Sequence, residues 1–195
     1  ESGNPIIYTN GDNDTFPLWY NQETEGFRTD ARTCNLSYLQ TDWYIDQMKR
    51  PAYDSPALPI TWDRTEYMEG QNEYVPIRPD FKKQIDKAYK AAAEEVLNGK
   101  NPEALNNIRA QFGDNPYELK NILKYWVRTK DGQAVIPTDS IVVKIDKEAV
   151  RRSGMMIPEA LGDSIPDYMH ISLKGKKGYP KRALYKSELM MLEML

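Results

Sequence analysis

The sequence predicts an α/β fold with a mostly parallel central sheet, helices on both faces and an inserted helical segment. Residues 5–9 form a short apolar run typical of a buried strand, and helix signals follow at once. A second strand pattern spans about 31–36, and a second helix pattern spans about 42–49. Strand, helix, strand and helix with short connections are typical of a parallel βαβ unit.

The first helix follows the sequence GDNDTFP. Either Asp14 or Thr15 suits the N-cap position, and Pro17 suits the first helical turn. Gly26 suits the left-handed residue that follows a helix. We therefore expect this helix to end at about Glu25.

A proline-punctuated stretch follows the second helix. Pro51 stops that helix, and four more prolines divide residues 51–79. The stretch shows no amphipathic pattern, so we expect an ordered surface excursion with short strands near 58–62 and 73–77.

Three helices are predicted between about 80 and 130. Apolar residues at helical spacing span 81–96, and Gly99 closes that helix. A second helix starts at Asn101. For the third, the sequence Asn-Pro-Tyr-Glu at 115–118 predicts an N-cap at Asn115 and a capping box with Glu118.

The remaining chain returns mainly to strands. Residues 140–145 and 167–173 have strand patterns, and a short helix capped by Asp146 lies between them. A turn at 175–178 predicts a hairpin in which residues 182–185 pair back, before a last helix that starts at Ser187. We expect a single α/β domain over residues 1–195, with the excursion at 51–79 and a helical insertion at about 80–130.

Composition excludes several classes of protein. Of the 195 residues 40% are hydrophobic, and the longest apolar runs are too short to span a membrane. Cys34 is the only cysteine and His170 the only histidine, so an internal disulfide and a zinc site of Cys and His ligands are both excluded. We expect no cofactor.

Charge is unevenly distributed along the chain. Residues 1–75 hold 13 acidic and 5 basic residues, together with 12 of the 21 aromatic residues. Residues 76–195 hold 16 acidic and 21 basic residues. An acidic, aromatic-rich part is a poor platform for nucleic acid, which requires basic residues among its aromatic rings. We therefore expect no nucleic-acid partner.

The first 50 residues resemble a known family. The matching segments are the strand with GDNDTFP, the turn Arg-Thr-Asp at 28–30, the sequence Asn-Leu-Ser at 35–37 and the helix that opens Thr-Asp-Trp-Tyr at 41–44. Segments at 146–150, at Ile157-Pro158-Glu159 and at 187–192 are also similar. The chain resembles the soluble domain of a bacterial domain-of-unknown-function family of polytopic membrane proteins related to protein O-mannosyltransferases.

This resemblance implies where the chain belongs and what it lacks. It implies a parent protein with an N-terminal transmembrane bundle, absent from this chain, that carries the catalytic acid. This chain would lie on the periplasmic or extracytoplasmic face of the membrane, with that bundle as a partner. We also interpret the chain as a fragment of a longer membrane protein, because its sequence ends within a helix pattern.

The acidic cluster Asp12, Asn13 and Asp14 is the first candidate site. Ligands of open α/β sheets bind beyond the carboxyl ends of strands, where this cluster is predicted to lie. The cluster could contact a ligand or partner, or it could hold a divalent cation through oxygen ligands. Alternatively the carboxylates only cap the helix and accept N–H bonds in the turn.

Aromatic residues are the second candidate feature. Trp62, Tyr67 and Tyr74 belong to the stretch without an amphipathic pattern, so we expect them on the surface, where rings can stack on sugars. We expect Trp19 and Tyr44 to be core residues that pack helices on the sheet.

The basic run at 174–182 could touch anionic lipid headgroups or be a solvated hairpin. His170 is expected to face outward on its strand. No nucleophile motif accompanies it, so we predict no catalytic residue.

The sequence thus supports three functional hypotheses. The first is a non-catalytic extracytoplasmic domain of a membrane glycosyltransferase-like protein that binds or orients a glycan or protein acceptor. The second is a metal-dependent sugar- or phosphate-transfer domain that uses Asp12 and Asp14. The third is a scaffold that docks on the membrane bundle.

Overall fold

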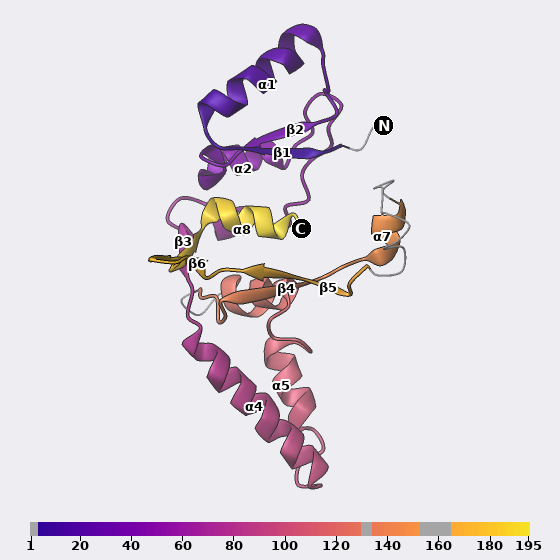
Figure 1. Cartoon of the computed structure of the whole chain (residues 1–195), viewed down its shortest axis with the longest axis vertical. Helices are drawn as coiled ribbons and strands as arrows, with labels where there is room; N and C mark the ends of the chain where they lie inside the picture. The colour runs from indigo at the N-terminus through magenta and orange to yellow at the C-terminus, as the bar shows by residue number, and fades with distance from the viewer. Residues whose placement is uncertain (1–3, 130–133, 153–164) are drawn as a thin grey trace. The chain divides into compact units, whose positions relative to one another are not determined.

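The first 50 residues form the predicted strand–helix–strand–helix unit in the computed structural model (Figure 1). Strand β1 (Ile6–Thr9) and strand β2 (Arg32–Asn35) pair in parallel, with Ile6 opposite Arg32 and Thr9 opposite Asn35. Helix α1 (Asp12–Glu25) connects them, and Gly26 follows it in the left-handed conformation, as predicted. A 3₁₀ turn, η1 (Tyr38–Gln40), leads to helix α2 (Asp42–Met48).

The structure describes residues 4–129, 134–152 and 165–195. They divide into two compact units, unit 1 (Glu1–Tyr74 and Leu184–Leu195) and unit 2 (Val75–Ala183). The sequence predicts a single domain with a helical insertion at about 80–130, whereas unit 2 also takes in the strands that follow that insertion.

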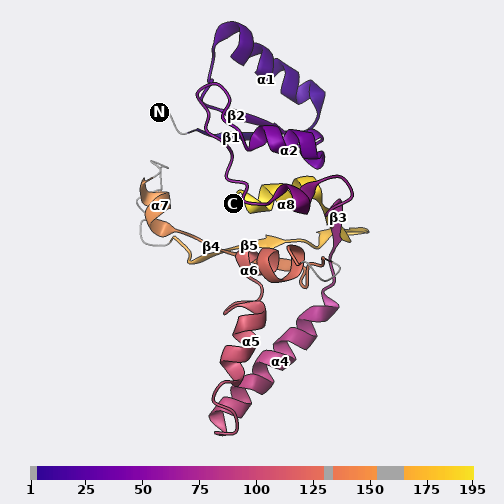
Figure 2. The ribbon, with the colours of Figure 1, turned by 180° about the vertical axis from the view of Figure 1, so that it is seen from behind.

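Helices α1 and α2 cover opposite faces of the β1–β2 pair in unit 1 (Figures 1 and 2). Thr33 Oγ1 donates to Gln22 Oε1 of α1 at 3.5 Å. The neighbouring Arg32 donates from Nη2 to the carbonyl of Gln47 in α2 at 2.8 Å. Successive side chains of a strand point to opposite faces, so this one strand supports both helices.

Unit 1 is completed by two segments that are distant in sequence. Helix α3 (Arg64–Tyr67) lies in the proline-rich stretch, and helix α8 (Lys186–Glu193) ends the chain. Glu193 of α8 accepts a hydrogen bond from Trp62 Nε1 at 3.0 Å. The C-terminal helix is therefore part of the packing of the first 75 residues.

A second link between the proline-rich stretch and α8 is an ion pair between a buried lysine and a partly exposed glutamate. Lys186 Nζ lies 2.6 Å from Glu73 Oε1, and Lys186 is 1% exposed. Burial raises the pKa of Glu73, but hydrogen bonds from Lys186, the Gly70 N–H and Gln40 outweigh it, so the pKa lies below its usual value.

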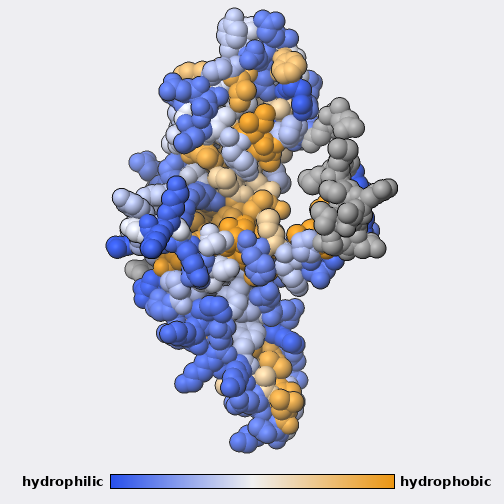
Figure 3. Space-filling view, viewed as in Figure 1, coloured by the Kyte–Doolittle hydropathy of each residue, from blue (hydrophilic) through white to orange (hydrophobic). Residues whose placement is uncertain are grey.

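Unit 2 begins with two helices that pack side by side. Helix α4 (Asp80–Leu97) ends before Gly99, and helix α5 (Ala104–Phe112) ends at Gly113, both close to the predicted limits. In the view of Figure 3 hydrophilic residues cover most of this pair, and apolar residues gather near the end where α4 passes into α5. Amphipathic helices of this kind bury one face and solvate the other.

The third predicted helix starts later than the sequence indicates. Helix α6 (Leu119–Ile122) begins after Glu118 and continues as a π-helical turn, η2 (Leu123–Val127). The prediction of Asn115 as N-cap is wrong, because Asn115 instead accepts the Tyr117 N–H in a local turn at 3.1 Å.

The rest of unit 2 consists of short strands and one helix. Strands β4 (Ser140–Lys144) and β5 (Tyr168–Ser172) pair antiparallel, and helix α7 (Lys147–Arg152) follows β4. Asp146 accepts the N–H groups of Glu148 and Ala149 at 3.0 Å, which confirms it as the cap of α7. The predicted segment Ile157-Pro158-Glu159 lies outside the described residues.

The predicted hairpin forms closer to its turn than expected. It pairs β6 (Gly175–Lys176) with β7 (Tyr179–Pro180), and residues 182–185 do not form its second strand. The chain passes between the units within β3 (Tyr74–Pro76) and β8 (Ala183–Tyr185). The described strands form short two-stranded sheets of mixed direction, so a mostly parallel central sheet stays a prediction.

Candidate functional site

The acidic cluster lies in the first turn of α1. Asp12, Asn13 and Asp14 are all exposed. The N-cap residue is Gly11, with φ of 92°, and no side chain caps the helix. The prediction of Asp14 or Thr15 as N-cap is therefore wrong, because the helix starts earlier, at Asp12. Asp14 instead accepts the N–H of the residue that precedes the N-cap, Asn10, at 3.3 Å.

Two neighbouring features explain the early start. The left-handed φ of Gly11 favours glycine, so the chain can turn directly from β1 into the helix. Thr15 donates from Oγ1 to the Gly11 carbonyl at 2.6 Å and lies 2.7 Å from the hydroxyl of Thr9. Pro17 lies inside the helix and not in its first turn, contrary to the prediction.

Asp12 connects the carboxyl ends of the two parallel strands. Asn35, fully buried at the end of β2, donates from Nδ2 to Asp12 Oδ1 at 3.4 Å. A hydrogen bond to Asp12 also raises the pKa of Tyr38. Among the described residues, no group of three or more His, Cys, Asp or Glu side chains is placed to hold a metal ion. The carboxylates of Asp12 and Asp14 therefore already make contacts within unit 1.

The three aromatic residues predicted to lie on the surface differ in their exposure. Trp62 is fully buried and Tyr67 is 1% exposed, so the prediction that they lie on the surface is wrong for both. Tyr74 is 65% exposed, as predicted. Trp62 donates to Glu193, and Tyr67 donates to Asp46 at 2.7 Å, so partners distant in sequence bury the two rings.

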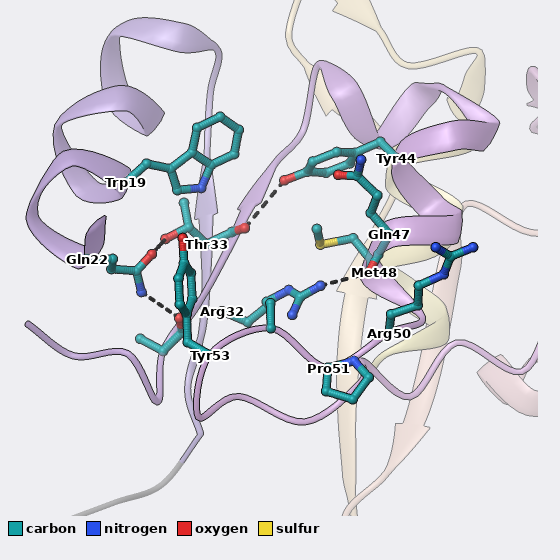
Figure 4. Close-up of a pocket in the computed structure, with 12 residues that line it drawn as sticks. Trp19, Gln22, Arg32, Thr33, Tyr44, Gln47, Met48, Arg50, Pro51 and Tyr53 are labelled. Carbon is teal, nitrogen blue, oxygen red and sulfur yellow. Dashed lines mark hydrogen bonds between the residues drawn. The ribbon is translucent and has the colours of Figure 1, made fainter. Parts of the chain in front are cut away.

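A pocket of about 310 Å³ lies in unit 1, at the outer edge of β2 (Figure 4). Helix α1 contributes Trp19 and Gln22, α2 contributes Tyr44, and the following loop contributes Tyr53. The full lining comprises Trp19, Gln22, Ala31, Arg32, Thr33, Tyr44, Gln47, Met48, Arg50, Pro51, Ala52 and Tyr53. Its volume is at the lower end of the range for small-molecule sites, which is roughly 300–1,000 Å³.

Side chains form hydrogen bonds with the main-chain groups of the outer edge of β2 where it borders this pocket. The Tyr44 hydroxyl accepts the Asn35 N–H at 3.0 Å and donates to the Thr33 carbonyl at 3.3 Å. Gln22 Nε2 donates to the Ala31 carbonyl at 2.8 Å. Burial raises the pKa of Tyr44 to about 12, so the phenol keeps its proton. The wall of the pocket is therefore fixed by hydrogen bonds.

Arg32 is the buried charged group of this wall. It is 6% exposed, and its Nη2 donates to the Gln47 carbonyl, as Figure 4 shows. Within the described part of the chain, its buried Nη1 has no hydrogen-bond partner. Burial lowers the pKa of Arg32, because the charged form loses hydration. One arm of the buried guanidinium, Nη1, can therefore donate a hydrogen bond to a bound group.

The sequence did not indicate this site. Trp19 and Tyr44 were predicted as core: Tyr44 is 1% exposed, which confirms it, whereas Trp19 is half-buried against the pocket. The one signal in the sequence is Arg32, a charged residue inside a predicted strand. The structure shows all four positions of that strand to be buried.

The other predicted features lie outside this pocket. His170 is exposed on β5, as predicted. Most of the basic run at 174–182 is also exposed. Of the helices in the described ranges, none has both the length and the apolar character that crossing a bilayer requires.

The described residues define a protein of helices and short sheets with a small-molecule-sized pocket beside a parallel strand pair. The chain belongs to the family TMEM260-associated domain 2, whose model matches residues 1–195. Comparisons with curated proteins and with solved structures found no match. The family match confirms the coarser part of the predicted resemblance, a domain from a membrane-protein family.

Proposed function

We propose that this chain is a non-catalytic binding domain of a membrane glycosyltransferase-like protein, on its extracytoplasmic side, that holds a glycan or protein acceptor. Family membership supports its origin in a membrane protein. The relation to protein O-mannosyltransferases comes from the sequence resemblance of the first 50 residues. The observation that carries the binding function is the pocket at β2, with three aromatic residues in its wall.

The pocket suits an acceptor that carries sugar. Trp19 and Tyr53 offer ring faces, which can pack on the C–H face of a sugar. The side-chain amide of Gln47 lies at the same wall and can bond to hydroxyl groups. Small-molecule sites commonly combine apolar walls with a few polar groups in this way.

Blocking the pocket in the full-length parent protein tests the proposal. Ala52 lines the pocket, so Ala52→Trp fills it, while Ala57→Trp places the same ring at an exposed position outside the pocket. Loss of acceptor binding or transfer is expected for Ala52→Trp alone. Normal binding and transfer in both variants would refute the proposal. Deleting residues 51–79 would be a poor test, because it removes the buried Trp62.

A docking role has one specific observation in its favour. Phe16 and Tyr20, one turn apart on α1, are 50% and 64% exposed. Such rings could contact the parent's own transmembrane bundle. The double substitution Phe16→Ser and Tyr20→Ser should then weaken co-purification of this chain with the separately expressed bundle, and unchanged recovery would exclude this role.

A further inference from the structure

We propose that the pocket at β2 takes an anionic sugar, whose carboxylate or phosphate group is held by Arg32. The inference deepens the proposed binding function and rests on it, because it names the chemical class of the acceptor's bound group. Among the described residues, four properties of the pocket lead to it: an incompletely bonded buried cation, a lining without acidic residues, aromatic walls and an exposed amide.

The first property is the bonding of Arg32. One arm of its guanidinium caps the C-terminal end of α2 through the Gln47 carbonyl, and the other arm, Nη1, is buried without a partner among the described residues. No carboxylate of the described chain forms an ion pair with it. A buried charge is costly unless it is paired. An anion bound at Nη1 would supply the missing partner.

The second property is the charge of the lining. Residues 1–75 hold 13 acidic and only 5 basic residues, yet the pocket is lined by Arg32 and Arg50 and by no acidic residue of the described chain. The side chain of Arg50 is exposed, so its charge can attract an anion at the rim. The pocket is therefore lined by two of the five basic residues in this acidic part of the chain.

The third and fourth properties favour a sugar over a simple anion. Trp19, half-buried in α1, and Tyr53, 54% exposed, provide ring faces in the wall of the same pocket. The main-chain carbonyl of Gln47 accepts the bond from Arg32. Its exposed side-chain amide lines the pocket and can bond to a ligand hydroxyl. A small inorganic anion would use the arginines and leave these groups without a role.

The test is a titration of the whole chain with five probes. Glucuronate carries a carboxylate, glucose 6-phosphate carries a phosphate, glucose is the neutral match, and acetate with inorganic phosphate supplies the anion without a sugar. Fluorine NMR of 5-fluorotryptophan-labelled protein reports the site, because Trp19 lines the pocket and its signal is identified with Trp19→Phe.

We expect at least one anionic sugar to shift the Trp19 signal in a saturable manner, with glucose binding more weakly. Arg32→Met, which keeps side-chain length without charge, should weaken that affinity roughly ten- to 150-fold, the equivalent of one charge-assisted hydrogen bond. Arg182→Gln removes an exposed arginine outside the pocket and should leave the affinity unchanged. Arg50→Gln, at an exposed site, gives a smaller loss and serves if Arg32→Met does not fold.

The outcomes separate the two proposals. Equal affinity for glucose and both anionic sugars, or an affinity that Arg32→Met and Arg50→Gln leave unchanged, would overturn the anionic inference while a sugar-binding pocket remains. Binding of acetate or inorganic phosphate as tight as that of the sugars would also overturn it. If no probe shifts the Trp19 signal and Ala52→Trp leaves the parent's transfer intact, both proposals fail.

Discussion

Unit 1 and unit 2 differ in what they bury. Eleven polar or charged residues are buried among the described residues, and only three of them belong to unit 2, namely Glu118, Asn121 and Thr138. The eight in unit 1 are Thr9, Thr15, Gln22, Arg32, Thr33, Asn35, Ser55 and Lys186. Buried polar groups are costly unless they are bonded, so unit 1 depends more than unit 2 on hydrogen bonds between buried groups.

The two units also use aromatic residues differently. In unit 2, Trp126 stacks on Phe112 with ring centroids 5.3 Å apart and contacts Phe81 edge-on at 5.8 Å. In unit 1, Trp19 and Tyr53 line a pocket. The comparison teaches that the aromatic cluster around Trp126 in unit 2 serves packing, whereas part of the aromatic content of unit 1 faces a cavity.

The largest effect should come from the buried tryptophan of unit 1. Trp62→Ala removes a fully buried ring and its hydrogen bond to Glu193, so it should destabilise unit 1 by about 3–5 kcal/mol. Tyr74→Ala, at a ring 65% exposed, should change stability by no more than about 0.5 kcal/mol. Urea unfolding followed by circular dichroism measures both, and equal effects would contradict the assignment of Trp62 to the core.

A smaller effect is expected for a glycine of unit 2. A Cβ at Gly113 would overlap the buried side chain of Asn121, whereas a Cβ at Gly99 would meet open space. Both residues have positive φ, 83° and 65°, and Gly113, with ψ of 175°, also lies in a region essentially confined to glycine, so its alanine variant adds backbone strain to the overlap. The overlap should make Gly113→Ala less stable than Gly99→Ala by about 1–3 kcal/mol. Equal urea midpoints for the two variants would show that Asn121 yields without cost.

Acid should weaken unit 1 through Glu73. The pKa of this carboxyl is lower in the folded chain than its usual 4.5, so its contribution to stability is present above that value and is lost as the pH falls below it. Thermal unfolding of the wild type should therefore show a steeper loss of stability below about pH 4.5 than Glu73→Gln does. Parallel pH curves for the two proteins would exclude this contribution.

The smallest effect should be seen at Cys34, where no change is expected under native conditions. The thiol is fully buried, and burial raises its pKa to about 12, although Arg32 opposes the shift. A thiol reagent at pH 8 should leave the folded protein unmodified and modify one site in urea. Rapid modification of the folded chain would show that unit 1 opens locally at β2.

The sequence predicted local structure well where the signals are local. The left-handed Gly26 after α1 and the cap at Asp146 depend on neighbouring residues, and the parallel pairing of β1 with β2 follows from the short strand–helix–strand pattern. The predicted N-terminus of α1 is wrong because a glycine at positive φ, a weaker N-cap signal than Asp or Thr, forms the turn. Local propensity cannot rank such competing starts.

The candidate site and the packing could not be predicted in the same way. Trp62 is buried by contacts that include Glu193, 131 residues later in the chain, and no periodicity in residues 51–79 signals such a contact. The pocket brings together α1, β2, α2 and the loop at Tyr53, so it exists only once these elements have packed. Asp12, a candidate ligand-binding residue from the sequence, instead accepts hydrogen bonds from Asn35 and Tyr38.

The central claim is that unit 1 retains the buried charge of Arg32 for binding and not for stability. The free energy of unfolding of wild type and Arg32→Met, measured by urea titration without ligand, tests it most directly. Since an apolar side chain of similar length removes an incompletely paired buried charge, we predict that the two proteins agree within about 1 kcal/mol or that Arg32→Met is more stable. A loss of about 3–5 kcal/mol, as when one partner of a buried ion pair is removed, would contradict the account.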